Sequence, residues 1–198
     1  MSQRKIEIVH EKRVYNGYTK VDDAIIKDAL EDGTESTYMR QKVVKFNAAA
    51  GLIYNVESEN VILVKQYRYP THIGKRNGLI YEAVAGKIDD GEEPKDAFIR
   101  EALEEVGYKL KEKNVEYCFR CFMTPGYSTE QIFFFIATAT NKDKIKNAGG
   151  GLKGENENIE ICEFHHLQFE SMINDLDDAK TKLLAYEALH RKLFDRTI

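Results

Sequence analysis

The chain has 198 residues, of which 42% are hydrophobic and 31% are charged, and its formal net charge is −4. This size and composition suit one soluble globular domain with a small appended element. The mildly acidic balance lacks the basic footprint of a nucleic-acid-binding protein. No apolar run approaches the ~18 residues of a membrane span, and the first residues lack the apolar segment of a signal peptide. We therefore expect a cytoplasmic protein that binds neither nucleic acid nor membrane.

Residues 1–46 are predicted to form a small antiparallel sheet that is separate from the rest of the chain. Strand-like runs cover Ile6–Glu11, Tyr18–Lys27 and Thr37–Phe46, with turn signals at Asn16-Gly17 and Asp32-Gly33. One short meander cannot cover all of its apolar residues, among them Ile6, Ile8, Val21 and Ile25. We therefore expect this sheet to pack on another surface.

Residues 47–198 are predicted to form the main domain, beginning with two strands at Ala48–Asn55 and Asn60–Arg68. The second strand contains a Val-Ile-Leu-Val run, which is typical of a strand buried on both faces. A loop over Tyr69–Gly78 follows, and Leu79–Ala85 leads into the next element. A helix is then predicted from about Pro94 to Gly107, because proline favours the first turn and glycine the end of a helix.

Further strands are predicted at Val115–Met123, Gln131–Thr138 and Ile159–His165. The tail contains Phe169–Leu176 and then Ala179–Phe194, whose apolar residues support an amphipathic helix. An order of strands, one helix, more strands and a final helix indicates an α+β fold, with a mixed sheet between helices.

The helix at Pro94–Gly107 has two contrasting faces. At about 100° per residue, one stripe collects apolar residues, namely Ile99, Ala102, Leu103 and Val106. The opposite side collects Glu101, Glu104 and Glu105, and we expect it to point away from the core. Like charges four residues apart destabilise a helix by roughly 0.2–0.5 kcal/mol. Such a face is either solvated or neutralised by hard divalent cations with oxygen ligands, Mg²⁺ above all.

The cysteines and histidines give no comparable pattern. Cys118 and Cys121 form a CxxC, which invites a zinc or redox interpretation, but they lie in a predicted strand, where residues three apart point to opposite faces. With Cys162 they make no disulfide framework, and we expect structural cysteines. The histidines have no partner at ligand spacing that sets them apart from surface or core residues, and these are His72, His165, His166 and His190.

The region around the acidic helix matches one spacing at every specified position, Gly-x5-Glu-x7-Arg-Glu-φ-x-Glu-Glu-x-Gly-φ, where φ is apolar. The specified residues are Gly86, Glu92, Arg100, Glu101, Glu104, Glu105 and Gly107. At average usage such a match would arise by chance about once in a million chains of this size. The chain therefore resembles the Nudix hydrolases, whose signature this spacing is.

Other segments resemble one branch of that family, the ADP-ribose and GDP-mannose pyrophosphatases. These segments are Gln66–Arg68, Glu82–Gly86, Met123–Glu130, the loop Asn147–Gly151 with Glu155–Glu160, and Lys180–Leu184. The resemblance implies a Nudix α/β/α sandwich with a mixed sheet, and it extends more loosely to the N-terminal strands. It also implies hydrolysis of a nucleoside diphosphate sugar to a nucleoside monophosphate and a sugar phosphate.

The resemblance assigns roles to the motif residues. Mg²⁺, with Mn²⁺ as a substitute, would be held by Glu101, Glu104, Glu105 and the backbone carbonyl of Ala85. Arg100 would pair with Glu92 and hold the loop on the helix, with Gly86 and Gly107 completing the structural motif. The general base would be Glu155 or Glu157, in a mobile acidic loop. Substrate contacts would come from Arg40, Arg68, Glu82 and Glu130.

The resemblance further implies a homodimer in which residues 1–46 exchange across a two-fold axis and Arg40 reaches the partner's substrate. Several alternatives stay open at this point. Arg68 could be an ordinary strand-end arginine, Glu82 a buried structural acid, and the glycine loop a mere connection. The substrate could be GDP-mannose or ADP-ribose. The protein could also be a Nudix-derived module that binds such a ligand without cleaving it, although a binder has no need of a complete glutamate set.

Overall fold

The computed structural model describes residues 4–151, 154 and 158–196, and it divides the chain into two compact units. The first unit combines Met1–Asn47 with Phe122–Gln131, and the second combines Ala48–Cys121 with Ile132–Ile198. The first unit thus contains the predicted N-terminal sheet together with a loop that lies about 80 residues further along the chain. The contacts within each unit explain this division.

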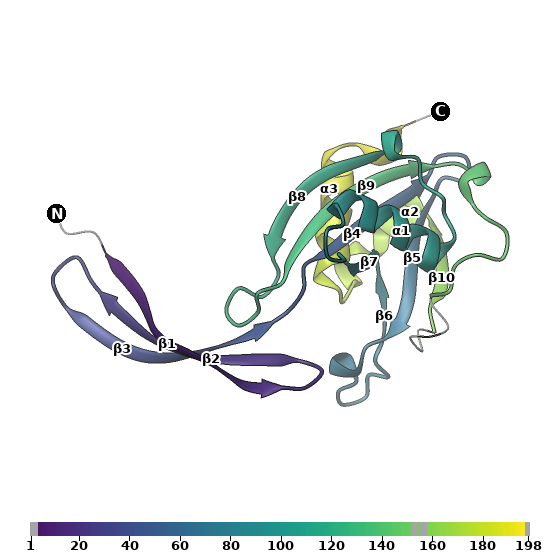
Figure 1. Cartoon of the computed structure of the whole chain (residues 1–198). Helices are drawn as coiled ribbons and strands as arrows, with labels where there is room; N and C mark the ends of the chain where they lie inside the picture. The colour runs from purple at the N-terminus through teal and green to yellow at the C-terminus, as the bar shows by residue number, and fades with distance from the viewer. Residues whose placement is uncertain (1–3, 152–153, 155–157, 197–198) are drawn as a thin grey trace. The chain divides into compact units, whose positions relative to one another are not determined.

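The first unit is a three-stranded antiparallel sheet in the order β1-β2-β3 (Figure 1). Its strands are β1 (Lys5–Asn16), β2 (Lys20–Ala29) and β3 (Glu35–Val44). The loop joins this unit through backbone hydrogen bonds, since Val43 N–H donates to the Tyr127 carbonyl at 2.6 Å and Thr129 N–H donates to the Val43 carbonyl at 3.0 Å. The strands match the sequence prediction, whereas the loop contact depends on pairing between distant segments.

Buried positions of the central strand β2 are partly acidic. Asp22 and Asp28 are both almost fully buried, and each pairs with an arginine of the N-terminal segment. Arg4 donates two hydrogen bonds to Asp28, at 2.9 and 2.6 Å, and Arg13 pairs with Asp22. Buried charges must be paired. Ion pairs therefore provide part of the stability in this unit that apolar packing provides in a larger core.

The described residues of the second unit form a mixed sheet with the path β10-β5-β4-β9-β8, to which β6 and β7 add beside β5 and β4. The parallel pair is β4 with β9, and β4–β5 and β5–β10 are antiparallel. The strand bounds are β4 (Ala48–Asn55), β5 (Asn60–Tyr67), β6 (Leu79–Glu82), β7 (Val84–Lys87), β8 (Val115–Phe122), β9 (Gln131–Ala139) and β10 (Glu160–His165).

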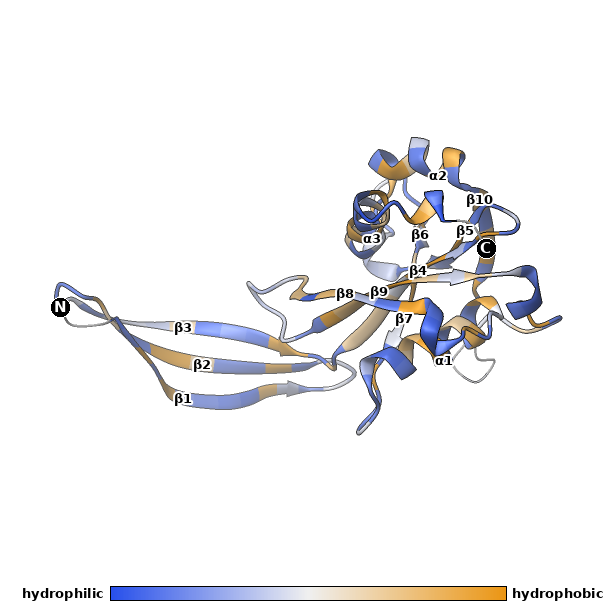
Figure 2. Cartoon of the chain, turned by 90° about the horizontal axis from the view of Figure 1, so that it is seen from above, coloured by the Kyte–Doolittle hydropathy of each residue, from blue (hydrophilic) through white to orange (hydrophobic). Residues whose placement is uncertain are grey.

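Helix α1 (Pro94–Val106) covers one face of this sheet, while α2 (His166–Met172) and α3 (Ala179–His190) lie on the other, as Figure 2 shows. Short 3₁₀ helices occur at Tyr69–Thr71, Glu112–Asn114, Asn141–Asp143, Ile173–Asp175 and Leu193–Asp195. None of the helices described is long and apolar enough to cross a membrane. The predicted α+β sandwich is confirmed.

The core follows from the alternation of side chains along the central strands. Ile53, Ile62 and Val64 belong to the cluster that packs under α1. Their neighbours Leu52 and Leu63 are also fully buried, and alternation places them on the face that α2 and α3 cover. A strand covered on both faces must be apolar at nearly every position, which explains the unbroken apolar run in β5.

Candidate functional site

Helix α1 lies close to the sheet because a glycine in β4 makes room for it. A Cβ atom built on Gly51 would overlap the ring of Phe98. That ring stacks on Phe135 of β9, with centroids 5.7 Å apart and planes at 5°. The helix ends at Gly107, which has a φ of 73° and donates its N–H to the Leu103 carbonyl at 3.1 Å. These contacts fix how far the helix lies from the sheet and where it ends, and they thereby position the three glutamates that it carries.

One glutamate lies on the buried face of α1. The predicted division of the helix into two faces is therefore right for Ala102 and Val106, which are buried, and wrong for Glu105 and Leu103. Glu105 is 4% exposed and buried together with Ala97, Phe98 and Ala102, whereas Leu103 is 38% exposed. The buried arc is therefore centred on Phe98 and Glu105. The carboxylate of Glu105 is accommodated there because its Oε2 accepts a hydrogen bond from the backbone N–H of Ala85 at 3.2 Å.

A second glutamate points at the same strand, β7. A Cβ atom built on Gly86 would overlap the carboxylate of Glu101, so this side chain occupies space that only glycine leaves open. Glu101 and Glu105 thus both reach the backbone of β7, at the neighbouring residues Ala85 and Gly86. The sequence motif contains Gly86, Glu101 and Glu105, and the structure brings these residues together in space beside Ala85.

Arg100 connects the third glutamate to this group. Its guanidinium binds Glu92 with two hydrogen bonds of 2.9 and 3.0 Å, and it also contacts Glu101 at 2.6 Å and Glu104 at 3.1 Å. A further hydrogen bond of 3.0 Å goes to the carbonyl of Lys87. The hydrogen bonds from Arg100 hold the pKa of Glu92 below its usual range. The arginine therefore fastens the Glu92 loop to α1 and gathers two of the three helix carboxylates.

The chemistry of this donor set fits a hard divalent cation. Glu101, Glu104 and Glu105 offer carboxylate oxygens, and β7 offers backbone carbonyls beside them, with no nitrogen or sulfur ligand in the group. Oxygen-only donors suit Mg²⁺. The absence of a side chain at Gly86 leaves the space in which the Glu101 carboxylate approaches the strand.

The glycine loop after Asn147 is docked on the C-terminal end of α1. Gly150 N–H donates to the Glu105 carbonyl at 2.8 Å, and Gly151 N–H donates to the Glu104 carbonyl at 3.0 Å. At Gly149, where φ is 93°, a Cβ atom would lie 2.9 Å from the Gly107 nitrogen. The glycines thus satisfy carbonyls that a helix end leaves unpaired. Glu155 and Glu157 lie outside the described residues.

Glu82, at the end of β6, forms an ion pair with Arg68, the residue after β5, and in this pair the carboxylate is buried while the guanidinium is exposed. Glu82 is 1% exposed, and Arg68 donates hydrogen bonds of 2.7 and 3.0 Å to its two carboxylate oxygens. Lys180 of α3 adds a contact of 3.2 Å to Glu82 and one of 2.7 Å to Asp178. Burial alone would lower the pKa of Lys180, but the attraction of Glu82 and Asp178 raises it. The pairing of Glu82 with Lys180 joins residues 98 positions apart, and no local sequence pattern indicates it.

Two residues with predicted substrate roles belong to the first unit. Arg40 is exposed on β3, where its guanidinium lies 4.2 Å from the centroid of the Tyr38 ring. Glu130 lies in the loop segment of that unit, and its N–H donates to the Ser128 hydroxyl at 3.2 Å. These two residues are therefore presented by a different unit from the helix glutamates.

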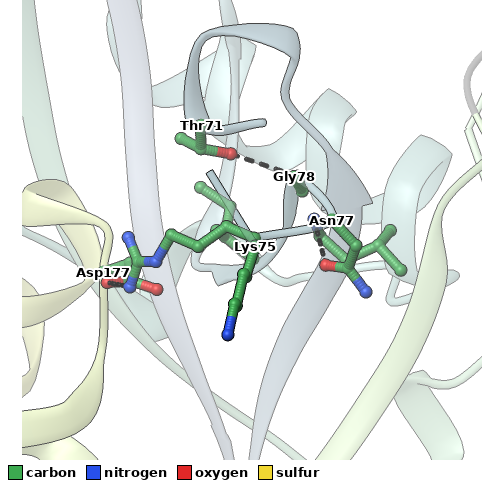
Figure 3. Close-up of a pocket in the computed structure, with 8 residues that line it drawn as sticks. Thr71, Lys75, Asn77, Gly78 and Asp177 are labelled. Carbon is green, nitrogen blue, oxygen red and sulfur yellow. Dashed lines mark hydrogen bonds and ion pairs between the residues drawn. The ribbon is translucent and has the colours of Figure 1, made fainter. Parts of the chain in front are cut away.

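A cavity of about 320 Å³ lies under the loop that follows Arg68 (Figure 3). Its lining includes Lys75, Asn77 and Arg76, and Arg76 pairs with Asp177 at 2.6 Å. Thr71 closes one side by donating its hydroxyl proton to the Gly78 carbonyl at 3.2 Å. None of the residues expected from the sequence to bind metal or substrate lines this cavity.

The cysteines are free thiols at Cys118, Cys121 and Cys162. Burial raises the pKa of the Cys118 thiol to about 11, so it is protonated at neutral pH and a poor nucleophile or metal ligand. This supports the structural interpretation of the CxxC.

Comparison with known proteins gives a consistent picture. The family model for the NUDIX domain matches residues 45–186. GDP-mannose pyrophosphatase of Escherichia coli O1:K1 / APEC is 34% identical over 184 residues, which cover 91% of this chain and 93% of that protein. The enzyme of the same name from Escherichia coli strain K12 is 33% identical with the same coverage. A crystal structure of an ADP compounds hydrolase superposes with a TM-score of 0.71 over 98% of this chain and 97% of its own, at 18% identity.

Proposed function

Because this chain belongs to the Nudix family, we propose that it is a Mg²⁺-dependent hydrolase of nucleoside diphosphate sugars. It would cleave the pyrophosphate bond to give a nucleoside monophosphate and a sugar phosphate. The observation that carries this proposal is the meeting of Glu101 and Glu105 at the backbone of Ala85 and Gly86. GDP-mannose is the first substrate to test, since relatives with that activity in their name cover 91% of the chain. ADP-ribose is the second.

We assign metal binding to Glu101, Glu104, Glu105 and the carbonyl of Ala85. Mg²⁺ held there would neutralise phosphate charge and lower the pKa of a bound water, and Mn²⁺ could replace it. Arg100 keeps these carboxylates close together through its contacts with Glu101 and Glu104. Burial of Glu105 limits its movement, which favours a fixed ligand over a flexible one.

We assign the general base to Glu155 or Glu157. The contact between the glycine loop and α1 supports this assignment, because Gly151 donates its N–H to the Glu104 carbonyl and stands four residues before Glu155 in the sequence. Closure of a loop over bound substrate would exclude water during the reaction.

We assign phosphate or nucleotide contacts to Arg68 and Arg40, and a sugar contact to Glu130. Glu82 is too deeply buried to be the main contact, and we infer that it positions Arg68 instead. Its carboxylate binds Arg68 through both oxygens, which leaves the outer edge of the guanidinium for an anion. Arginine suits this role because its planar group binds phosphate oxygens in pairs.

We further propose that the protein is a cytoplasmic homodimer. Every residue of β1 is exposed, and its outward apolar side chains include Ile6, Ile8, Val9 and Tyr15. An exposed edge strand with apolar residues is a surface that a second copy of the chain would cover. The free cysteines of the described chain are compatible with a reducing compartment. No nucleic-acid or membrane partner is proposed.

A substrate panel tests this function. The purified protein is incubated with Mg²⁺ and, in separate reactions, GDP-mannose, ADP-ribose, a dinucleotide or an oxidised nucleotide, and products are separated by chromatography. We expect the highest kcat/KM for GDP-mannose, with GMP and mannose 1-phosphate as products. Tight binding of the sugar nucleotide without turnover would instead identify a binding module.

Metal removal gives a second test. Because the proposed metal site is catalytic and the helix is held by Phe98 and Gly107, omission of Mg²⁺ from protein that holds no transition metal should abolish turnover but leave the melting temperature nearly unchanged. Added Mg²⁺ should restore activity. Unfolding of this protein at room temperature on withdrawal of Mg²⁺ would contradict the assignment, since it would make that ion structural.

A further inference from the structure

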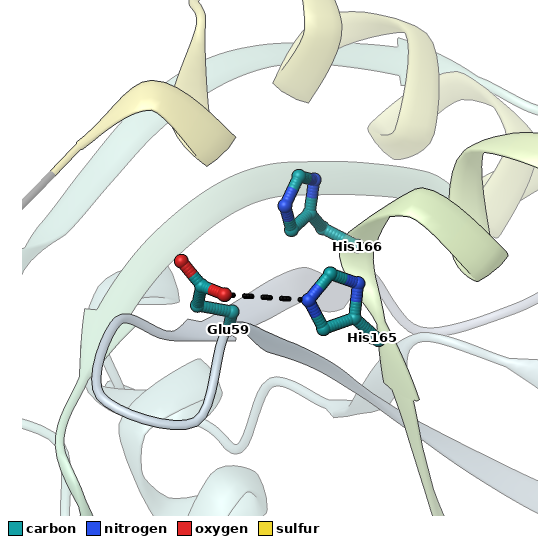
Figure 4. Close-up of side chains that lie close together, drawn as sticks. All are labelled: Glu59, His165 and His166. Carbon is teal, nitrogen blue, oxygen red and sulfur yellow. Dashed lines mark hydrogen bonds and ion pairs between the residues drawn. The ribbon is translucent and has the colours of Figure 1, made fainter.

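Two histidines and a glutamate from distant parts of the chain meet at one end of the sheet. Glu59 lies in the turn between β4 and β5, and His165 and His166 lie at the junction of β10 and α2. One ligand atom from each of the three side chains lies within 4.8 Å of the other two. Figure 4 shows the Glu59 carboxylate directed at the His165 ring, with the His166 ring beside it.

The backbone, and not side-chain flexibility alone, brings these residues together. In the antiparallel pair of β5 and β10, Asn60 lies opposite His165. The next residue, His166, donates its N–H to the Glu59 carbonyl at 2.9 Å. Glu59 has a φ of 56°, a left-handed conformation that is uncommon for a residue other than glycine, asparagine or aspartate. The sheet register therefore places the carboxylate beside both rings.

The two rings are also held in place by their surroundings. His165 Nε2 lies 3.3 Å from Glu59 Oε2. His166 Nδ1 lies 3.4 Å from Glu170 Oε1, and its ring stacks on Phe194 with centroids 5.8 Å apart. Because Nδ1 of His166 faces Glu170, this ring is oriented to offer its Nε2 to a metal ion, and such carboxylate–histidine pairs are common around protein metal ligands. The Nε2 of His165 faces Glu59, so an ion between them would bind that nitrogen. The Nδ1 of His165 accepts a hydrogen bond of 3.4 Å from the Leu167 N–H, and metal binding at Nε2 would place the ring proton on Nδ1 and replace this long hydrogen bond.

We propose that Glu59, His165 and His166 bind a divalent transition-metal ion of the Zn²⁺ class. Two imidazoles and one carboxylate suit Zn²⁺ better than Mg²⁺, which prefers oxygen ligands alone. With Zn–N distances of about 2.0–2.1 Å, ligand atoms of a tetrahedral site lie about 3.3 Å apart. The present limit of 4.8 Å closes to that value through side-chain movements on the order of 1 Å. Water would complete the coordination.

This site is distinct from the carboxylates of α1. Ala85, which accompanies Glu105, pairs with Ala50 of β4. The turn that carries Glu59 begins after Asn55, five residues further along β4 and about 17 Å away at ~3.4 Å per residue. An ion at this end of the sheet would join the β4–β5 turn to the start of α2. Its role would be to stabilise the fold, and it does not depend on the proposed hydrolase activity.

Titration calorimetry with Zn²⁺ in excess Mg²⁺ tests the proposal, because the Mg²⁺ occupies the carboxylates of α1. Wild-type protein should bind one Zn²⁺ per chain and gain melting temperature, since an ion that binds the folded state stabilises it. His165→Ala should weaken the affinity by at least about tenfold, as expected for the loss of one of three ligands. His190→Ala, which alters an exposed histidine at the end of α3, should bind Zn²⁺ like the wild type.

Glu59→Gly is the sharper variant, because glycine accepts a φ of 56° without strain. It should keep or raise the melting temperature without metal, yet lose Zn²⁺ affinity by a similar factor. His166 is left intact in these experiments, since its ring packs on Phe194 and Tyr54. The proposal is overturned if the wild type shows no saturable Zn²⁺ binding in excess Mg²⁺. It is equally overturned if His165→Ala and Glu59→Gly bind Zn²⁺ as tightly as the wild type.

Discussion

The three glutamates of α1 differ in their surroundings, although the sequence presents them as one set. Glu105 is buried and hydrogen-bonded to the backbone of Ala85. Glu101 lies over Gly86, and the side chain of Glu104 is 26% exposed beside Arg100. Burial next to a strand fixes a ligand more firmly than a position on the helix surface does. We therefore expect Glu105 and Glu101 to matter more for activity than Glu104.

Replacement of Glu105 by glutamine should separate chemistry from stability. The amide oxygen can still accept the hydrogen bond from Ala85, so the melting temperature should change little. Loss of the negative charge should lower kcat by roughly 10²–10⁴. Asp96→Asn, on the exposed side of the same helix, is the control and should keep normal rates. Retention of more than about a tenth of the wild-type rate by Glu105→Gln would contradict the central role of this residue.

Gly86→Ala should impair metal binding without unfolding the protein. The new methyl group would overlap the Glu101 carboxylate, which is the far end of a flexible side chain and can move aside. The Mg²⁺ concentration for half-maximal activity should therefore rise, and kcat should fall by roughly 10- to 100-fold. Adding Glu101→Asp to this variant shortens the obstructed side chain and should restore part of the activity. An unchanged Mg²⁺ requirement in Gly86→Ala would place the metal ligands elsewhere.

Among the secondary-structure elements, α1 depends on contacts at both ends and in its middle. Pro94 starts it, Gly107 ends it, and Phe98 rests on Gly51. The glycine loop then binds the carbonyls of Glu104 and Glu105. The helix with the proposed metal ligands and the loop that leads to the proposed base are thus linked by two backbone hydrogen bonds.

Gly149→Ala should disturb this link. A side chain at a φ of 93° is strained, and its Cβ would lie 2.8 Å from Ile161 Cδ1 and 2.9 Å from the Gly107 nitrogen. We expect a stability loss of about 1–2 kcal/mol and a fall in kcat of roughly 10- to 100-fold. Gly154→Ala has open space around its Cβ and serves as the matched control. Thermal melts and initial rates measure both effects, and equal rates for the two variants would show that loop docking does not affect catalysis.

At the scale of the whole molecule, the first unit is the part that we expect to be covered by a second copy of the chain. Its strand β1 is exposed throughout, and two of its buried side chains are the paired acids Asp22 and Asp28. Arg40, proposed to contact substrate, lies on this unit. If the unit exchanges between two chains, the active site of one chain needs Arg40 of the other.

Mixing two inactive variants tests this exchange. Arg40→Ala and Glu105→Gln subunits are unfolded together and refolded as an equal mixture. Half of the dimers are then mixed, and each mixed dimer holds one intact site, so activity should recover to about a quarter of the wild-type value for a two-fold dimer. Refolding each variant alone is the control and should give no recovery. A monomeric mass in solution with full wild-type activity would refute the dimer, and failure of the mixture to recover would refute the sharing of Arg40.

The sequence by itself determined the strands β4 and β5, the helix α1 and the residues of the Nudix motif. These depend on local signals, namely apolar runs, Pro94 before the helix, Gly107 after it and a fixed spacing between them. Local signals persist in any tertiary setting, so the fold class and the family could be predicted.

Tertiary structure decided which side of α1 is buried, because Phe98 and Gly51 set the rotation of the helix and turn Glu105 inward. It also decided the pairing of Glu82 with Lys180 and the meeting of Glu59 with His165 and His166. These partners are 98 or more residues apart, and sheet register and helix packing alone bring them within contact distance. Periodicity along a single segment carries no information about such contacts, since it reports the faces of one element and not what the rest of the chain places against them.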